Sequence, residues 1–158
     1  MKRHQKSSKQ RKKIVRVWTL ARAQKALPLI ASIVRSVREE RLNAQAHQLQ
    51  AERLALRPGR PDREALIAHE EALRDTREAV ERFESGLREL FGLNIYCLDA
   101  VSGQALIPFA HGEQLAWFVF DLFESAGLQT WRFHEDPLTT RRPLAELQDT
   151  TVKDSLIL

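Results

Sequence analysis

Apolar residues recur at three- and four-residue steps through two long segments of the chain, which predicts two long α-helices. The first segment starts after Thr19, a typical helix N-cap residue, and runs to about Leu56. Its apolar stripe first follows Leu20, Ala23, Leu27, Ile30, Val34 and Val37, and then shifts to Leu42, Ala46, Leu49 and Leu56. The next segment, RPGRPD at residues 57–62, contains two prolines and a glycine and predicts a turn.

The second helical segment has the most regular pattern in the chain. Asp62 is placed to cap it, and its stripe keeps heptad spacing almost to Gly92. The members of this stripe are Leu66, His69, Leu73, Thr76, Val80, Phe83, Leu87 and Leu90. Because the connecting turn is short, we expect a coiled-coil-like antiparallel hairpin over residues 19–91, with Val80 and Phe83 at its seam.

After Gly92 the pattern changes from a helical period to a strand period. Four apolar segments are separated by turns that each contain a glycine, which predicts a four-stranded antiparallel β meander. The segments are residues 94–98, 104–109, 115–123 and 128–134. We therefore predict an α+β fold, a long antiparallel helical hairpin followed by a small β unit at residues 94–134. The predicted domain covers residues 17–144, and residues 145–158 form a C-terminal extension.

The positive charge of the chain is concentrated at its N-terminus. Residues 1–16 contain eight Lys and Arg residues, no acid and few apolar residues, so we expect a disordered basic tail. Such a tail is a candidate contact for nucleic acid or another polyanion. The alternatives are a solvated extension, or a segment that precedes the true start of the chain. The candidate polyanion-binding residues are Lys2, Arg3, Lys6, Lys9, Arg11, Lys12, Lys13 and Arg16.

Cysteine content and hydropathy bear on the compartment of the protein. Cys97 is the only cysteine, so no disulfide can form within the chain, and a reducing compartment such as the cytoplasm is expected. No apolar run approaches eighteen residues, so we expect no membrane-spanning segment and no membrane partner.

Acidic, histidine and arginine residues of the predicted β unit and the residues that follow it are the candidates for ligand chemistry. Asp and His side chains suit zinc, manganese or iron, but their spacing here matches no metal motif, so we predict no metal, no cofactor and no catalytic residue. His134 with the two arginines could instead bind a phosphate or carboxylate, or one arginine could pair with an acid such as Asp121. The weak ligand-binding candidates are Asp99, Asp121, His134, Arg141 and Arg142.

Several motifs resemble a bacterial and archaeal family called domain of unknown function 2203. The first helix opens with VWTLARAQKALPLI, residues 17–30, which resembles the aromatic-Thr-Leu helix start and the following Leu-Pro of that family. The remaining matches are Asp99, Gly103, Pro108, Phe109, Trp131, His134, Arg141 or Arg142, Pro143 and Leu144. The chain resembles a divergent member from residue 17 to about residue 144. The resemblance implies two long helices and a following compact unit, but no activity.

The leading hypothesis is a non-enzymatic interaction or scaffold protein. Its hairpin would provide a surface for a protein partner or for self-association, and its basic tail would contact nucleic acid or another polyanion. The alternative is a small enzyme, or a ligand- or metal-binding module, with a site in the β unit. Side chains that converge within about 3–4 Å at a pocket would favour the alternative.

Overall fold

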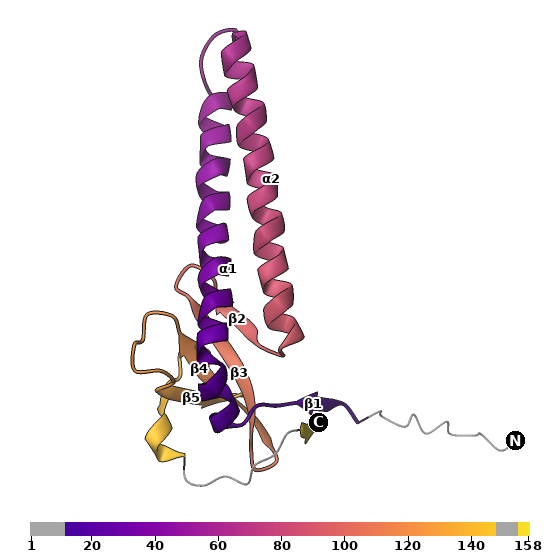
Figure 1. Ribbon diagram of the computed structural model, residues 1–158, viewed down its shortest axis with the longest axis vertical. Helices are drawn as coiled ribbons and strands as arrows, with labels where there is room; N and C mark the ends of the chain where they lie inside the picture. The colour runs from indigo at the N-terminus through magenta and orange to yellow at the C-terminus, as the bar shows by residue number, and fades with distance from the viewer. Residues whose placement is uncertain (1–11, 148–154) are drawn as a thin grey trace, which may run out of the picture.

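Two long helices stand side by side as an antiparallel hairpin, with a sheet packed against the base of α1 (Figure 1). This is a computed structural model, and it describes residues 12–147 and 155–158. α1 comprises Leu20–Ala55 and α2 comprises Arg63–Gly92. The sheet strands are β2 (Tyr96–Asp99), β3 (Gln104–His111), β4 (Gln114–Asp121), β5 (Thr130–Phe133) and β6 (Arg142–Pro143), followed by the short helix η1 (Leu144–Glu146). The predicted α+β fold is confirmed.

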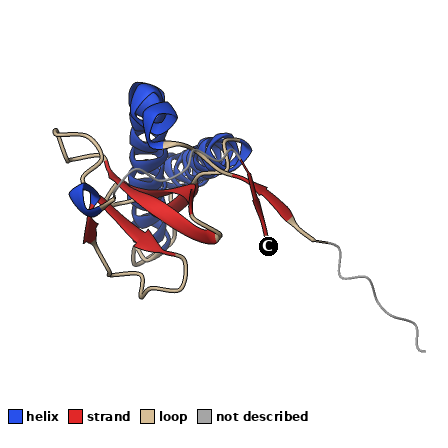
Figure 2. Cartoon of the chain, turned by 90° about the horizontal axis from the view of Figure 1, so that it is seen from below, coloured by secondary structure: helices blue, strands red, loops and turns tan. Residues whose placement is uncertain are grey.

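The sheet is an antiparallel meander with the order β2-β3-β4-β5-β6. Figure 2 views the molecule from the sheet end and shows the strands crossing below the hairpin. Four strands were expected, and β6 is an additional two-residue strand paired to β5 through Trp131 and Arg142. A pair that short, with Pro143 as one of its two residues, carries no strand periodicity in the sequence.

The predicted helix caps are present. The Thr19 hydroxyl accepts a hydrogen bond from the Arg22 amide, and the Asp62 carboxylate accepts one from the Ala65 amide at 2.8 Å. Each bond satisfies an amide that has no partner within its helix, and this fixes where the helix begins. Within the described residues, neither helix has the length and apolar content needed to cross a membrane.

The hydrophobic core lies where the sheet meets the base of the hairpin. β3 and β4 contribute Phe109 and Phe118, whose rings stack at 4.0 Å between centroids, and Trp131 of β5 meets Phe109 edge to face. Trp18 ties this core to the helices, since its amide donates to Pro108 at 2.7 Å and its indole to Leu93 at 2.9 Å. The buried helix residues that complete the core are Ala23, Ile30, Ile33, Val34, Val37 and Leu90.

Small residues at the contact between the two helices let them approach closely along the hairpin. Every seventh position of α1 is buried, and these residues are Ala23, Ile30, Val37, Ala44 and Ala51. The matching heptad positions of α2 are Ala65, Ala72, Ala79 and Gly86, of which Ala72 and Ala79 are buried. The helices approach so closely that a Cβ atom on Gly86 would lie 2.6 Å from Cγ2 of Val37.

The predicted seam was therefore only partly right. Leu87 and Phe83 are partly buried, whereas Val80 is 36% exposed and Leu66 is 54% exposed on the flank of α2. The heptad of larger residues gives the stronger periodic signal, but the neighbouring alanine heptad allows closer approach of the two backbones. The interior of the hairpin is consequently thin, and several large apolar side chains remain outside it.

The first and last strands pair with each other. β1 (Ile14–Arg16) and β7 (Ser155–Ile157) form a two-stranded antiparallel ribbon, and Leu156 is buried against Val17 and Ala110. The predicted tail at residues 1–16 therefore overlaps a strand, and the predicted extension at 145–158 contains its partner. Pairing across the whole length of the chain leaves no local signal in either segment, which is why it was not predicted.

Candidate functional site

The outer face of α1 carries an apolar stripe that no element of the described chain covers. We define this face by six positions at alternating steps of three and four residues: Glu39, Leu42, Ala46, Leu49, Arg53 and Leu56. Leu49 is 47% exposed and Leu56 is 82% exposed, while Leu42 is partly buried. The inward positions at this level are Ala44 and Ala51. The upper half of α1 therefore has two apolar stripes, and the one with the larger side chains points outward.

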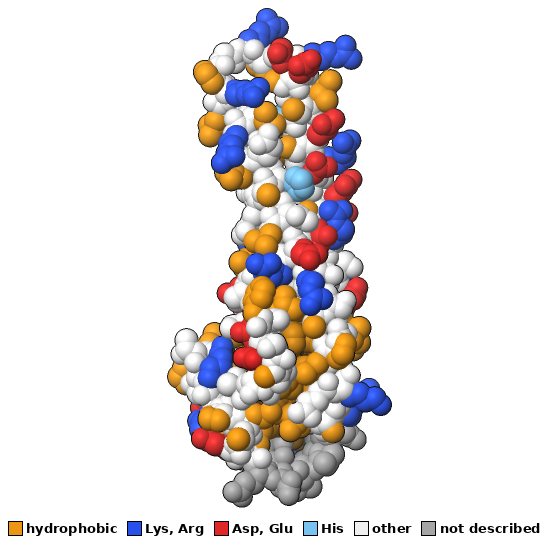
Figure 3. All heavy atoms as spheres, turned by 60° about the vertical axis from the view of Figure 1, so that its left-hand side comes forward, with side chains coloured by type: hydrophobic (Ala, Val, Ile, Leu, Met, Phe, Trp, Pro, Cys, Tyr) orange, Lys and Arg blue, Asp and Glu red, His pale blue; other side chains and the backbone are white. Residues whose placement is uncertain are grey.

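The same part of α1 is free of charged residues. Residues 42–51, LNAQAHQLQA, contain no Asp, Glu, Lys or Arg, although 29% of the chain is charged. Figure 3 shows the hairpin with hydrophobic and uncharged side chains over much of this side, and with many of the charged side chains along one edge and at the tip. A solvated helix face usually carries charge, whereas the centre of a protein–protein contact is depleted of it.

The predicted ligand residues of the β unit occupy separate places. Arg142 makes a two-pronged ion pair with Asp136, from Nε to Oδ2 at 2.8 Å and from Nη2 to Oδ1 at 2.9 Å. Asp136 also accepts the Phe133 amide at 2.9 Å, and the Arg142 guanidinium lies over the Phe133 ring. This arginine thus fixes the C-terminal segment, as one reading of the sequence expected, although its partner is Asp136 rather than Asp121.

Electrostatics identify this ion pair as the best-defined polar contact in the β unit. The Arg142 guanidinium hydrogen bond, with help from the Phe133 amide, lowers the pKa of Asp136 to about 2. Asp136 in turn raises the pKa of Arg142. Arg132 is buried beside them and donates through Nη2 to the main-chain oxygens of Asp136 and His134. Both partners therefore stay charged and paired, which favours a structural role.

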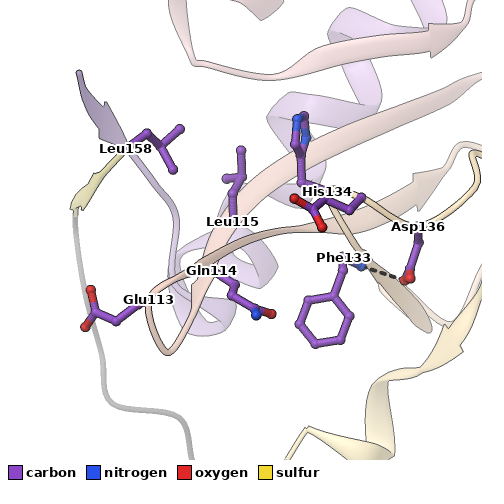
Figure 4. Close-up of a pocket in the computed structure, with 8 residues that line it drawn as sticks. Glu113, Gln114, Leu115, Phe133, His134, Asp136 and Leu158 are labelled. Atoms are coloured by element: carbon purple, nitrogen blue, oxygen red, sulfur yellow. Dashed lines mark hydrogen bonds between the residues drawn. The ribbon is translucent and has the colours of Figure 1, made fainter. Parts of the chain in front are cut away.

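His134 lines an open depression of about 400 Å³ at the edge of the sheet. Its Nδ1 accepts a hydrogen bond from the indole of Trp117 at 3.1 Å. Figure 4 shows the His134 and Phe133 rings directed to opposite sides of β5, with Leu158 on the far side of the depression. The two predicted arginine partners of His134 do not line this depression. The predicted anion site with His134, Arg141 and Arg142 is therefore not assembled.

Asp121 and Arg141 lie together at a second, smaller depression of about 200 Å³. Asp121 accepts the Phe123 amide at 2.9 Å, and Arg141 donates to the carbonyl groups of Leu138 and Thr140. Asp99 lies elsewhere, at the end of β2. There it accepts the amides of Val101 and Ser102, and the Ser102 hydrogen bonds lower its pKa.

Two further features of the described residues bear on metal and thiol chemistry. In the parts of the chain that the structure describes, no three His, Cys, Asp or Glu side chains are grouped to hold a metal ion. Cys97 is partly buried, and this burial, together with the charge of Asp99, raises the pKa of its thiol. A raised pKa leaves little thiolate, so this cysteine is poorly suited to act as a nucleophile.

The basic residues of the N-terminal segment fall on both sides of the described boundary. Lys2, Arg3, Lys6, Lys9 and Arg11 lie outside the described residues. Lys12 and Lys13 are exposed, and Arg16 is exposed on β1. Lys13 and Leu158 exchange two main-chain hydrogen bonds, so this part of the predicted tail is joined to the ribbon.

The sequence shows the shift of the α1 stripe to Leu42 and Leu49 but does not say whether this stripe is buried or exposed. The available signal was the absence of charge between residues 42 and 51.

No family model matches this chain, and no curated protein or solved structure is significantly similar to it. The resemblance to the domain of unknown function 2203 family therefore stays a prediction.

Proposed function

We propose that this protein is a non-enzymatic interaction protein whose hairpin presents the outer face of α1 to a protein helix. The observation that carries the proposal is the outward stripe of Leu42, Ala46 and Leu49 on the charge-free stretch of residues 42–51, which Leu56 extends beyond Arg53. Exposed apolar patches of this kind are typical of binding surfaces. The β unit supports the hairpin from below. In it Arg142 is paired with Asp136, and Asp99, Asp121 and Arg141 hydrogen-bond to the main chain.

The experiment that tests this function is capture of binding proteins from a lysate of the source organism. The variant Leu42→Asp/Leu49→Asp places two charges on the outer face and leaves the alanine interior intact. We expect it to lose protein partners that the wild type retains after nuclease treatment, while it remains folded with a single cooperative melting transition. Identical captured sets for both proteins would contradict the proposal.

The basic tail at residues 1–16, the N-terminal arm, is proposed to add a weak contact with nucleic acid or another polyanion. Eight cations without an intervening acid bind by electrostatics alone, so affinity should be insensitive to sequence. With about four to six phosphate contacts, the slope of log affinity against log salt should be about −4 to −5 on duplex DNA.

A salt titration that compares the full chain with a deletion of residues 2–11 tests this arm. The deletion removes five of the eight cations and keeps Lys13, which is hydrogen-bonded to Leu158. We expect binding to be lost in the deletion. Equal binding by both forms, or none even at low salt, would remove the polyanion contact from the proposed function.

A further inference from the structure

We propose that the partner of the outer face of α1 is α1 of a second copy of this chain, packed antiparallel across a two-fold axis. This inference rests on the interaction function proposed above and names the partner. The outer face repeats at steps of three and four residues from Glu39 to Leu56, which is the spacing that two helices need to interlock side chains along a shared seam.

Only one antiparallel register pairs all six positions of the face. If the two-fold axis passes between residues 47 and 48, every position of the face meets another position of the same face. The resulting layers are Glu39 opposite Leu56, Leu42 opposite Arg53, and Ala46 opposite Leu49 of the second copy, each repeated by symmetry. The four central layers combine leucine with alanine or with the aliphatic part of an arginine, so they bury apolar surface throughout.

The charges at the two ends of the face favour antiparallel pairing with a second copy of the chain. The face has an acid, Glu39, at its lower end and a base, Arg53, at its upper end, with no charge between them. Antiparallel pairing brings Glu39 within one helical turn of Arg53 of the second copy, at both ends of the contact. Parallel pairing would instead set Glu39 against Glu39 and Arg53 against Arg53. The face is therefore complementary to itself only in the antiparallel direction.

The length of free helix agrees with this register. Just before the face begins, Arg38 donates its Nε to the carbonyl of Val101 at 2.8 Å, which marks the upper edge of the β unit (Figure 1). The face ends at Leu56, the C-cap of α1. Residues 39–56 span about 27 Å, and in the antiparallel register this full length pairs with itself. Such a contact is at the small end of specific interfaces, so we expect a dissociation constant of about 10 µM.

Sedimentation velocity of the full chain between about 1 and 300 µM tests the association. We expect the wild type to shift from monomer to dimer over this range, and Leu49→Asp to stay monomeric. Ile67→Asp is the matched control, because Ile67 is 48% exposed against 47% for Leu49 but lies on α2. The control should dimerise like the wild type. A monomeric wild type, or a control as defective as Leu49→Asp, would overturn the proposal.

A charge swap tests the register. Glu39→Arg should weaken dimerisation about tenfold, and adding Arg53→Glu to the same chain should restore it to within about threefold of wild type. The two residues are about 21 Å apart along one helix, so the rescue can only arise between copies. A double variant no better than Glu39→Arg would overturn the antiparallel register.

The failure of this inference can be told apart from failure of the proposed function. If the wild type stays monomeric while the lysate capture depends on Leu42 and Leu49, the second copy is the wrong partner and the interaction function stands. If the wild type stays monomeric and the captured proteins are unchanged, both proposals are wrong.

Discussion

The lower and upper parts of α1 use their apolar residues in opposite ways. Below Arg38 the helix is packed by α2 and by the sheet, and Ile30, Val34 and Val37 are buried, although Leu29 is 54% exposed. Above Arg38 only α2 covers the helix, and alanines 44 and 51 point inward while Leu49 and Leu56 point outward. Similar apolar content therefore produces a core in one half and an exposed stripe in the other.

This difference is the basis for proposing a contact on the upper half of the hairpin. A hairpin selected for its own stability would bury its leucines, because each buried leucine stabilises the fold by about 1.5–3 kcal/mol relative to an exposed one. Here the fully buried residues of the upper half are alanines, Leu54 and Leu73 are only partly buried, and close approach of the two backbones replaces bulk. The leucines are thereby left available for a contact outside the monomer.

The largest expected effect comes from placing one charge in each half of α1. Val37→Asp buries an unpaired carboxylate in the core and should lower the free energy of unfolding by at least about 3 kcal/mol. Leu49→Asp should cost only about 0.5–1 kcal/mol at low protein concentration, mainly through helix propensity. Urea denaturation measures both. Similar costs for the two variants would mean that Leu49 is buried in the monomer and that the contrast between the halves is wrong.

The close approach of the helices predicts an intermediate effect at Gly86. Alanine is normally the better helix residue, but Gly86→Ala places its Cβ 2.6 Å from Cγ2 of Val37, a stiff and fully packed side chain. We expect a loss of about 1–3 kcal/mol from overpacking. In a Val37→Ala background the same change should be neutral or stabilising. Independent, additive effects in this double-mutant cycle would show that the helices are further apart.

The smallest expected effect concerns the β unit at the base of the hairpin. The pKa of Asp136 is lowered to about 2 in the folded chain, so its ion pair stabilises the fold above the ordinary carboxyl pKa of 3.8. That contribution is lost as pH falls from about 4 to about 2. Asp136→Asn should therefore melt below wild type near neutral pH, and the difference should narrow across this acidic window.

Glu135→Gln is the control for the acid titration. Glu135 is the exposed neighbour of Asp136 and also lines the His134 depression. The melting temperature of Glu135→Gln should equal that of the wild type at every pH. A constant gap between Asp136→Asn and wild type would show that the ion pair is not the source of the pH dependence.

Local signals in the sequence were sufficient to predict most of the fold. The caps at Thr19 and Asp62, the turn at residues 57–62 and the glycine-containing turns of the meander act over a few residues, and the structure confirms them. The pairing of β1 with β7 joins opposite ends of the chain and has no such signal. The partner of Arg142 was also missed, since Asp121 and Asp136 are equivalent until the strands are placed.

The candidate surface was harder to predict than the fold. Hydrophobic periodicity identifies an apolar stripe, but it does not say whether the stripe faces the neighbouring helix or solvent. In α2 it favoured Val80 over Ala79, because larger residues give the stronger signal, and in α1 it did not assign the stripe that contains Leu49 to either side. Which of two neighbouring stripes faces the other helix depends on how closely the two backbones approach. Small residues such as Gly86, where an added Cβ would meet Val37, set this approach.

The central claim is that the outer face of α1 joins two copies in an antiparallel pair, and pulsed electron paramagnetic resonance tests it most directly. A single nitroxide on Arg60→Cys, in a Cys97→Ser background, marks the exposed turn at the tip of each hairpin. With the two-fold axis between residues 47 and 48, the two labels should lie about 30 Å apart at concentrations that favour the dimer. A label separation below about 20 Å, as expected when parallel helices bring the tips together, or no dipolar coupling at all, would contradict the account.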